Sequence, residues 1–160
     1  MAKAEKTNVM RTLERLKIPF RVHCYADSGV ISGADVAAYL HQDPARVFKT
    51  LVTVGKSRNH YVFMIPVEEE LDLKRAAAAA GEKALEMLPA KELLPLTGYI
   101  HGGCSPVGMK KQFRSFIQRT AENFDTILFS AGKIGYQVEC SLEGLRQAVP
   151  VETADVIVAL

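Results

Sequence analysis

The sequence predicts an α+β domain built around a mixed, largely antiparallel β-sheet. Segments with the two-residue period of strands interleave irregularly with segments of helical period. Several neighbouring apolar runs are separated only by short polar turns, which predicts hairpins. The 160 residues include 48% hydrophobic and 24% charged residues, as is usual for a globular chain. We therefore expect residues 1–160 to form a single domain.

The first quarter of the chain is predicted to hold three helices and one strand. Apolar residues recur at helical spacing after a polar cap at Thr7 or Asn8, and Pro19 is expected to end this helix. Residues 20–25 then alternate in the manner of a half-buried strand. Two short helices are predicted next, over residues 35–40 and, with Asp43 as the N-cap, 43–48.

The middle of the chain predicts the centre of the sheet. Residues 50–54 and 60–65 are rich in β-branched and aromatic side chains, and the polar turn between them predicts that they pair as a hairpin. Asp72 is expected to cap a helix that runs to Ala80, and Gly81 is expected to end it. A strand over 83–88 and a helical turn over 90–94 are predicted to follow.

The last third of the chain is predicted to return to strands. Residues 111–118 are ambiguous, because their aromatic spacing suits a helix while their position after a loop favours a strand, and we prefer the strand. Two clearer strands, 126–130 and 136–140, flank a second glycine-rich loop over 131–135. Ser141 is expected to cap a final helix that extends to Ala148.

Charge and cysteine content limit the classes of function. The net charge of +2 is far below that of proteins that coat nucleic acid, so any such contact should be confined to one end of the polymer. Cys24, Cys104 and Cys140 are odd in number and far apart, which predicts neither a disulfide framework nor a structural zinc site. The N-terminus lacks the apolar stretch of a signal peptide, and no run has the length of a transmembrane helix. We expect a cytosolic protein with no membrane contact.

The most informative stretch is the glycine-rich segment 97–108, which Lys110 and Lys111 follow closely. Its four glycines and one proline rule out an ordinary helix or strand interior. Glycine allows successive backbone N–H groups to approach a ligand, so the segment is either an anion cradle or a structural turn. It matches neither the dinucleotide fingerprint nor the P-loop.

Lys49 is the most informative single residue, because it interrupts an apolar run at a helix-to-strand junction. Lysine is almost never buried without a partner, so its ammonium either reaches solvent at a sheet edge or points into a cleft to meet an anion. The neighbouring Thr50 can add a hydroxyl. Ser130 and the loop after it repeat the combination of hydroxyl, glycine and lysine, either as a second part of a site or as a plain turn.

His101 and Cys104 lie three residues apart, which suits half of a zinc site or a Cys/His nucleophile pair. No further ligand or orienting group is apparent in the sequence, so no metal is expected and Cys104 is interpreted as a small loop residue. No paired carboxylates with glycosidase spacing and no Ser/His/Asp arrangement can be identified.

Motifs along nearly the whole chain resemble those of the YbaK/EbsC family, which includes the Cys-tRNA(Pro) deacylases. This family shares a fold with the editing domain of bacterial prolyl-tRNA synthetases. The matching motifs, in order, are His23-Cys24-Tyr25, Val47-Phe48-Lys49-Thr50-Leu51, Leu71-Asp72-Leu73-Lys74-Arg75, Thr97-Gly98-Tyr99, Gly102-Gly103-Cys104-Ser105-Pro106-Val107-Gly108, Lys110-Lys111 and Ser130-Ala131-Gly132-Lys133. The resemblance implies a largely antiparallel sheet or partial barrel flanked by helices.

The resemblance also implies an activity and a set of site residues. The activity is trans-editing, the hydrolysis of the ester that joins a mischarged amino acid to tRNA, most closely Cys-tRNA(Pro), with no cofactor and by a substrate-assisted mechanism. The implied partners are the acceptor end of aminoacyl-tRNA and, as a candidate, prolyl-tRNA synthetase. The implied catalytic residues are Lys49 and Gly102. The implied substrate-binding residues are Tyr25, Thr50, Gly103, Ser105, Pro106, Ser130 and Gln137.

Two positions depart from the deacylases that this chain resembles. Gln137 stands where they carry an aspartate, and Ile31 or Ser32 stands where they carry an aromatic residue. These changes bear on amino-acid specificity more than on reaction class. The alternative functions are a non-catalytic module that binds aminoacyl-tRNA or a synthetase, and a small-molecule phosphate-binding protein.

Overall fold

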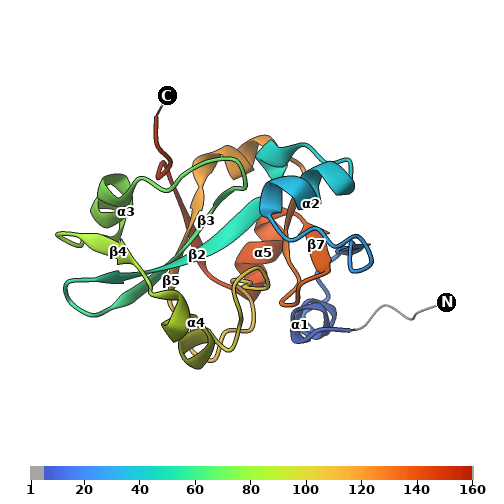
Figure 1. Cartoon of the computed structure of the whole chain (residues 1–160), viewed down its shortest axis with the longest axis horizontal. Helices are drawn as coiled ribbons and strands as arrows, with labels where there is room; N and C mark the ends of the chain where they lie inside the picture. Colours follow the sequence, from blue (N-terminus) through green and yellow to red (C-terminus); the bar gives the residue numbers. More distant parts are fainter. Residues whose placement is uncertain (1–5, 160) are drawn as a thin grey trace.

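The structure is a computed structural model that describes residues 6–159, and its strands form two sheets (Figure 1). Residues 1–5, which belong to the segment where no signal peptide is predicted, lie outside the described residues. The α+β class and the mixed, largely antiparallel pairing are confirmed. The strands are divided over two sheets, and neither sheet closes into a barrel within residues 6–159.

The larger sheet has five strands in the order β4-β2-β3-β5-β8. The predicted hairpin of β2 and β3 is confirmed, with Thr50 opposite Met64 and Val54 opposite His60. The strand preferred for the ambiguous segment is also confirmed as β5, which pairs with β3 in parallel. The strands are β2 (Phe48–Gly55), β3 (His60–Pro66), β4 (Leu85–Met87), β5 (Arg114–Gln118) and β8 (Val151–Ala154).

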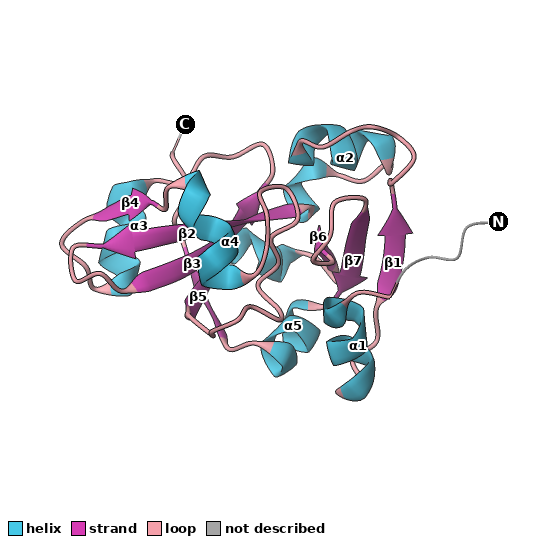
Figure 2. Cartoon of the chain, turned by 60° about the horizontal axis from the view of Figure 1, so that its bottom comes forward, coloured by secondary structure: helices cyan, strands magenta, loops and turns pink. Residues whose placement is uncertain are grey.

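The smaller sheet has the order β1-β7-β6, and both of its pairings are antiparallel. Its strands are β1 (Arg21–Cys24), β6 (Ile127–Ser130) and β7 (Tyr136–Cys140). Figure 2 shows this sheet beside the larger one, with α1 and α2 at opposite ends of its strands. An isolated parallel bridge between Val47 and Leu128 joins the two sheets along a seam.

Five of the helices in the described residues begin at a polar N-cap, whereas α4 and η2 have no side-chain cap. The side chains of Thr7, Ser32, Asp43, Asp72 and Ser141 each accept a hydrogen bond from a backbone N–H in the first turn. The α-helices are α1 (Asn8–Arg15), α2 (Gly33–Tyr39), α3 (Leu73–Ala80), α4 (Ala90–Thr97) and α5 (Leu142–Ala148). Two 3₁₀ helices, η1 (Pro44–Arg46) and η2 (Arg119–Asn123), complete the set in the described part of the chain.

Several predicted boundaries are wrong, each for a physical reason. α1 ends before Pro19, because Lys17 already adopts a left-handed conformation with φ of 58°. α4 is longer than the predicted turn and contains Pro95. η2 and β8 were not predicted. β8 is a short run that pairs with β5, from which η2, β6, β7 and α5 separate it in the sequence.

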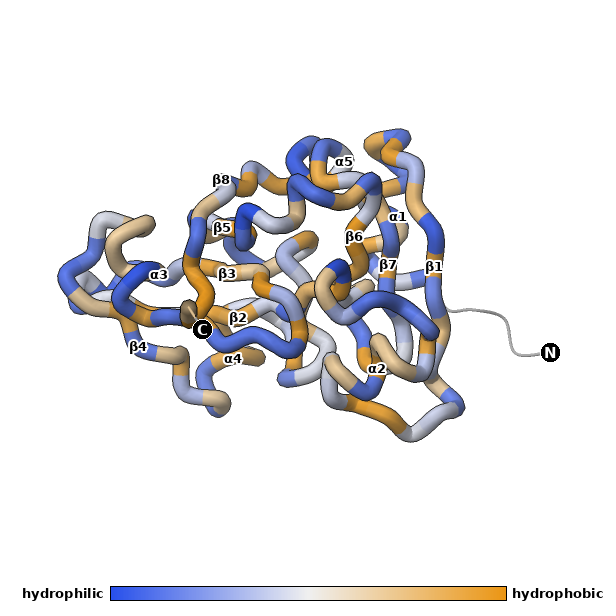
Figure 3. The backbone as a smooth tube through the Cα atoms, turned by 90° about the horizontal axis from the view of Figure 1, so that it is seen from above, coloured by the Kyte–Doolittle hydropathy of each residue, from blue (hydrophilic) through white to orange (hydrophobic). Residues whose placement is uncertain are grey.

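Two main hydrophobic cores stabilise the fold, and the first reaches across the seam to Phe48 and Met64 of the larger sheet. One packs α1 and α5 against the smaller sheet and includes Val9, Leu13 and Phe129, all fully buried. The other packs α3 against the larger sheet, where alanines such as Ala76 allow close approach. The apolar run of β6 is visible in orange in Figure 3. Within residues 6–159, no helix has the length and apolar character needed to cross a membrane.

Candidate functional site

The seam between the sheets brings separate polar residues to one place. Lys49 follows Val47 by two residues and Ser130 follows Leu128 by two residues, and the bridge between Val47 and Leu128 is parallel. Ser130 is paired across the smaller sheet with Gln137. The same end of the seam therefore collects residues from β2, β6 and β7.

A cavity of about 430 Å³ opens at this end of the seam. A volume of this size accommodates a small ligand. Lys49 is the only lysine, arginine, aspartate or glutamate in its lining. The lining residues are Tyr25, Ile31, Ser32, Gly33, Val36, Phe48, Lys49, Thr50, Leu51, Val67, Leu93, His101, Gly102, Cys104, Ser130 and Gln137.

Lys49 belongs to the lining of the cavity, as the cleft interpretation of its position requires. Partial burial is the main influence on the Lys49 pKa and lowers it. The negative charges of Glu70 and Glu69, which follow β3, raise this pKa by a smaller amount. The ammonium is therefore incompletely hydrated. It is placed to bind an anionic group that enters the cavity.

Two other cavity residues carry polar atoms that are buried and unpaired. The hydroxyl oxygen of Thr50 and the amide oxygen of Gln137 have no hydrogen-bond partner among the described residues. Ser130 differs from them, because its hydroxyl oxygen accepts a hydrogen bond from the Gly132 N–H at 3.1 Å. The cavity thus holds hydrogen-bonding capacity that the protein itself does not use.

The first glycine loop contributes Gly102 to the cavity wall. Gly102 has φ of 86°, a left-handed conformation that favours glycine. Its N–H donates no hydrogen bond within the described part of the chain, whereas the Gly103 N–H donates to the Ile100 carbonyl at 3.0 Å. Of the two, the Gly102 N–H is therefore the one without an acceptor in the described protein.

The remaining predicted loop residues lie behind the lining. A Cβ atom on Gly103 would lie 3.2 Å from the backbone nitrogen of Ile134, so Gly103 allows the two glycine loops to pack together. Ser105 is fully buried and its hydroxyl accepts the Val107 N–H. Pro106 is buried too. The structure therefore brings six of the nine predicted site residues together at the cavity, and Gly103, Ser105 and Pro106 are not among them.

Tyr99 fixes the two glycine loops relative to each other. Its hydroxyl donates to the Val107 carbonyl at 2.5 Å, and a Cβ on Gly108 or Gly132 would lie 2.8 or 3.0 Å from Tyr99 atoms. Burial raises the Tyr99 pKa to about 12, with a smaller contribution from Cys104. The sequence alone gave no positioning role to Tyr99, although the recurrence of glycine in both loops is consistent with a large side chain between them.

Cys104 and His101 both reach the cavity lining. Burial raises the Cys104 pKa to about 12, so the thiol is protonated near neutral pH and is a poor nucleophile. Among residues 6–159, no group of three or more His, Cys, Asp or Glu side chains is arranged to hold a metal ion.

Sequence reasoning missed much of the apolar wall. Gly33 packs closely against Val67: a Cβ at position 33 would lie 2.5 Å from a Val67 methyl carbon. Leu93 reaches the wall from α4. No motif marks these residues, because an apolar side chain that lines a cavity has the same pattern as one in the core.

Comparisons with known proteins agree with this geometry. Residues 27–148 match the model of a family described as the aminoacyl-tRNA editing domain. A curated protein of Enterococcus faecalis is 43% identical over 153 residues, which are 95% of this chain and 93% of that protein; its provisional name is Cys-tRNA(Pro)/Cys-tRNA(Cys) deacylase EbsC.

Solved structures share the fold over almost the full length. The crystal structure of a hypothetical protein has a TM-score of 0.85 at 23% identity and covers 94% of this chain and 99% of its own. A structure provisionally described as a trans-editing enzyme for prolyl-tRNA synthetase has a TM-score of 0.83 at 20% identity, with coverage of 96% and 99%.

Proposed function

This chain belongs to the aminoacyl-tRNA editing domain family, and from that premise we propose that it hydrolyses the ester of mischarged aminoacyl-tRNA, with Cys-tRNA(Pro) as its main substrate. The observation that carries the proposal is the cavity at the seam. It joins one partly desolvated lysine, one free glycine N–H and unpaired hydrogen-bonding atoms, which together suit an ester with a nearby phosphate.

The roles of the residues follow from their positions. Lys49 binds a phosphate or ribose oxygen of the terminal adenosine. The Gly102 N–H donates to the carbonyl oxygen as negative charge develops on it, a contact that is typically worth about 3 to 4 kcal/mol of the barrier. Tyr25, Thr50, Ser130 and Gln137 surround the amino acid. Gly103, Ser105 and Pro106 bind the substrate indirectly, by holding Gly102 in place.

The nucleophile in this mechanism comes from the substrate. The sulfur of the cysteinyl side chain attacks the carbonyl carbon, and the ester C–O bond breaks. The ribose oxygen leaves with a proton, so that free tRNA and a four-membered thiolactone are formed, and water then opens the thiolactone to cysteine. The buried, protonated Cys104 is consistent with this scheme, because the enzyme needs no thiolate of its own.

The wider setting is part of the same proposal. Residues 1–160 act as a single domain, because the cavity takes residues from both sheets. The binding partner is the acceptor end of aminoacyl-tRNA, for which a formal net charge of only +2 is sufficient. Association with prolyl-tRNA synthetase and a cytoplasmic location would bring the enzyme to newly mischarged tRNA.

Turnover of a panel of aminoacyl-tRNAs tests the proposal. We expect release of cysteine from Cys-tRNA(Pro), and much slower release of alanine from the same tRNA, because alanine supplies no thiol. Equal rates on the cysteinyl and alanyl forms would rule out thiol assistance as the main mechanism. Tight binding of these tRNAs without any turnover would instead identify a non-catalytic binding module.

A further inference from the structure

Gln137 is a buried polar residue whose amide oxygen finds no hydrogen-bond partner within residues 6–159. It lies on β7, the central strand of the smaller sheet, and its exposed fraction is only 7%. Its amide oxygen is unpaired, and so is the hydroxyl oxygen of Thr50, which reaches the same cavity from β2. Leaving a buried oxygen without a hydrogen bond is unfavourable, so two such oxygens at one cavity indicate a ligand that supplies donors.

The charges around the cavity limit what that donor can be. No carboxylate lines the cavity, and Lys49 adds a positive charge to it. A cationic donor would meet the Lys49 ammonium without a compensating anion in the wall. A neutral donor, such as a hydroxyl or a thiol, satisfies the two oxygens at no such cost. Because the Gln137 amide also has an N–H₂ group, it can accept from a hydroxyl or donate to it.

We propose that Gln137, together with Thr50, selects amino acids that carry a neutral hydrogen-bond donor on a short side chain. This inference rests on the proposed function and adds to it a specificity element. Selection then depends on a hydrogen bond as well as on pocket size. A site that discriminates by size alone separates substrates by only about 10- to 200-fold per methylene, and it separates side chains of equal size poorly.

The proposal makes a specific ranking among substrates that lack a thiol. Seryl and 2-aminobutyryl groups have the same number of non-hydrogen atoms, and they differ only in a hydroxyl against a methyl group. Entry of the methyl group leaves the buried oxygens unpaired. We therefore expect wild-type kcat/KM for the seryl ester of one tRNA to exceed that for the 2-aminobutyryl ester by about 10- to 100-fold.

Three variants locate the effect. Gln137→Met removes the amide and keeps a side chain of similar length. Thr50→Val replaces the hydroxyl with a methyl group. The matched control is Gln118→Met, which makes the same chemical change at another buried glutamine, outside the cavity. Each variant is assayed for kcat/KM on both esters. Binding of the corresponding non-hydrolysable 3′-amide analogues of aminoacyl-adenosine is measured by calorimetry.

We expect the ratio of seryl to 2-aminobutyryl kcat/KM to fall toward one in Gln137→Met and to fall in part in Thr50→Val. The ratio should be unchanged in Gln118→Met. Near-equal wild-type rates and affinities for the two groups would overturn the inference. So would a preference that survives both cavity substitutions. If cysteinyl, seryl and 2-aminobutyryl esters all resist hydrolysis, the proposed enzymatic function fails. The calorimetric ratio then still decides the inference, because it requires no turnover.

Discussion

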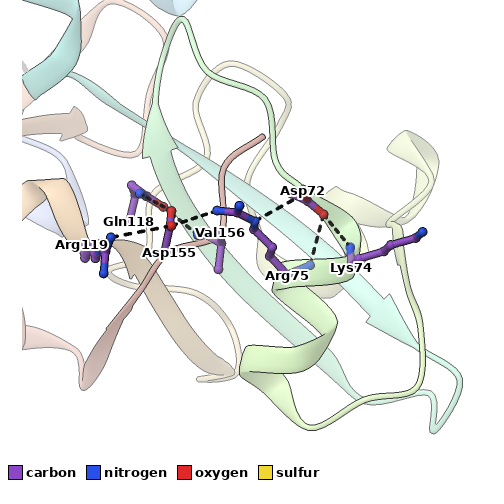
Figure 4. Close-up of polar contacts among 7 residues, drawn as sticks. All are labelled: Asp72, Lys74, Arg75, Gln118, Arg119, Asp155 and Val156. Atoms are coloured by element: carbon purple, nitrogen blue, oxygen red, sulfur yellow. Dashed lines mark hydrogen bonds and ion pairs between the residues drawn. The ribbon is translucent and has the colours of Figure 1, made fainter. Parts of the chain in front are cut away.

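Two buried glutamines in this chain have opposite surroundings. Gln118, at the end of β5, is 2% exposed and uses its whole amide: the Nε2 group donates to Asp155 at 2.9 Å, and the Oε1 atom accepts from the Val156 N–H at 2.7 Å (Figure 4). Gln137, the second residue of β7, is 7% exposed and its amide oxygen has no partner among the described residues. The same side chain is therefore used for stability in one place and left available for a ligand in the other.

The surroundings of Gln118 show what a completed polar cluster does. Asp155 also accepts a hydrogen bond from Arg75 of α3 at 2.8 Å, and Arg119 lies 3.9 Å from the same carboxylate. Figure 4 shows these side chains converging from three separate segments. The Asp72 N–H donates to the Val156 carbonyl at 2.8 Å. Together these contacts fasten the segment after β8 to the start of α3.

The same contrast occurs within β7 itself. Glu139, two residues after Gln137, accepts hydrogen bonds from His23 at 2.7 Å, Arg46 at 2.7 Å and Thr126 at 2.6 Å. Burial favours a raised Glu139 pKa, but these hydrogen bonds outweigh it and lower the pKa to about 2. The Glu139 carboxylate is therefore fully partnered, whereas the Gln137 amide oxygen two residues before it is not.

The largest effect is expected from loss of the cavity charge. Lys49→Ala should lower kcat/KM by about 100-fold, because a hydrogen bond to a charged group is lost. Lys49→Arg should not restore activity, because a planar guanidinium does not fit the space of an ammonium. The thermal midpoint should not fall, since burial already disfavours the charge. Steady-state kinetics and thermal denaturation measure both. Lys74→Ala, which removes an exposed lysine from α3, is the control and should be silent.

The next effect concerns acid stability and Glu139. Its pKa is about 2 in the folded protein against an ordinary value of 4.5, so its contribution to stability is present above pH 4.5 and is lost as the pH falls toward 2. The difference corresponds to about 3 kcal/mol. Urea denaturation at a series of pH values should show this loss in the wild type, whereas Glu139→Gln should be destabilised at pH 7 and should show a flatter profile. Parallel profiles for the two proteins would contradict the assignment.

Substitution of the two glutamines tests the comparison directly. Gln118→Met removes one hydrogen bond to Asp155 and leaves the Val156 N–H without a partner, so it should lower the free energy of unfolding by about 2 kcal/mol. Activity per folded molecule should be unchanged. Gln137→Met should not lower the free energy of unfolding, since no hydrogen bond within the described protein is lost. A large loss of stability in Gln137→Met would remove the distinction between the two sites.

The smallest effects are expected in the glycine loop. Gly102→Ala places a Cβ at a left-handed residue, where the strain is about 1–2 kcal/mol, and should lower kcat/KM by about tenfold. Cys104→Ala should stay within about twofold of the wild type. An inactive Cys104→Ala enzyme would instead support Cys104 as a nucleophile. Single-turnover kinetics on Cys-tRNA(Pro) would distinguish the two results.

The sequence by itself determined the local structure and the probable chemistry of single residues. The caps at Thr7, Asp43 and Asp72 could be identified because capping requires only a side chain and the backbone N–H groups two or three residues later. Residues 60–65 could be identified as a strand because β-branched and aromatic side chains suit a pleated sheet. Lys49 was conspicuous because a lysine within an apolar run needs a partner or a route to solvent.

Only the tertiary structure decided which of these residues meet. The parallel pairing of β5 with β3, and the seam between Val47 and Leu128, join segments that are far apart in the chain and share no local pattern. The glutamines make the point most clearly, since both lie in apolar strands. The partner of Gln118 lies 37 residues away, and the partner of Gln137 is absent from the described chain. A side chain is satisfied or unsatisfied by whatever folds against it, and local sequence carries no record of that.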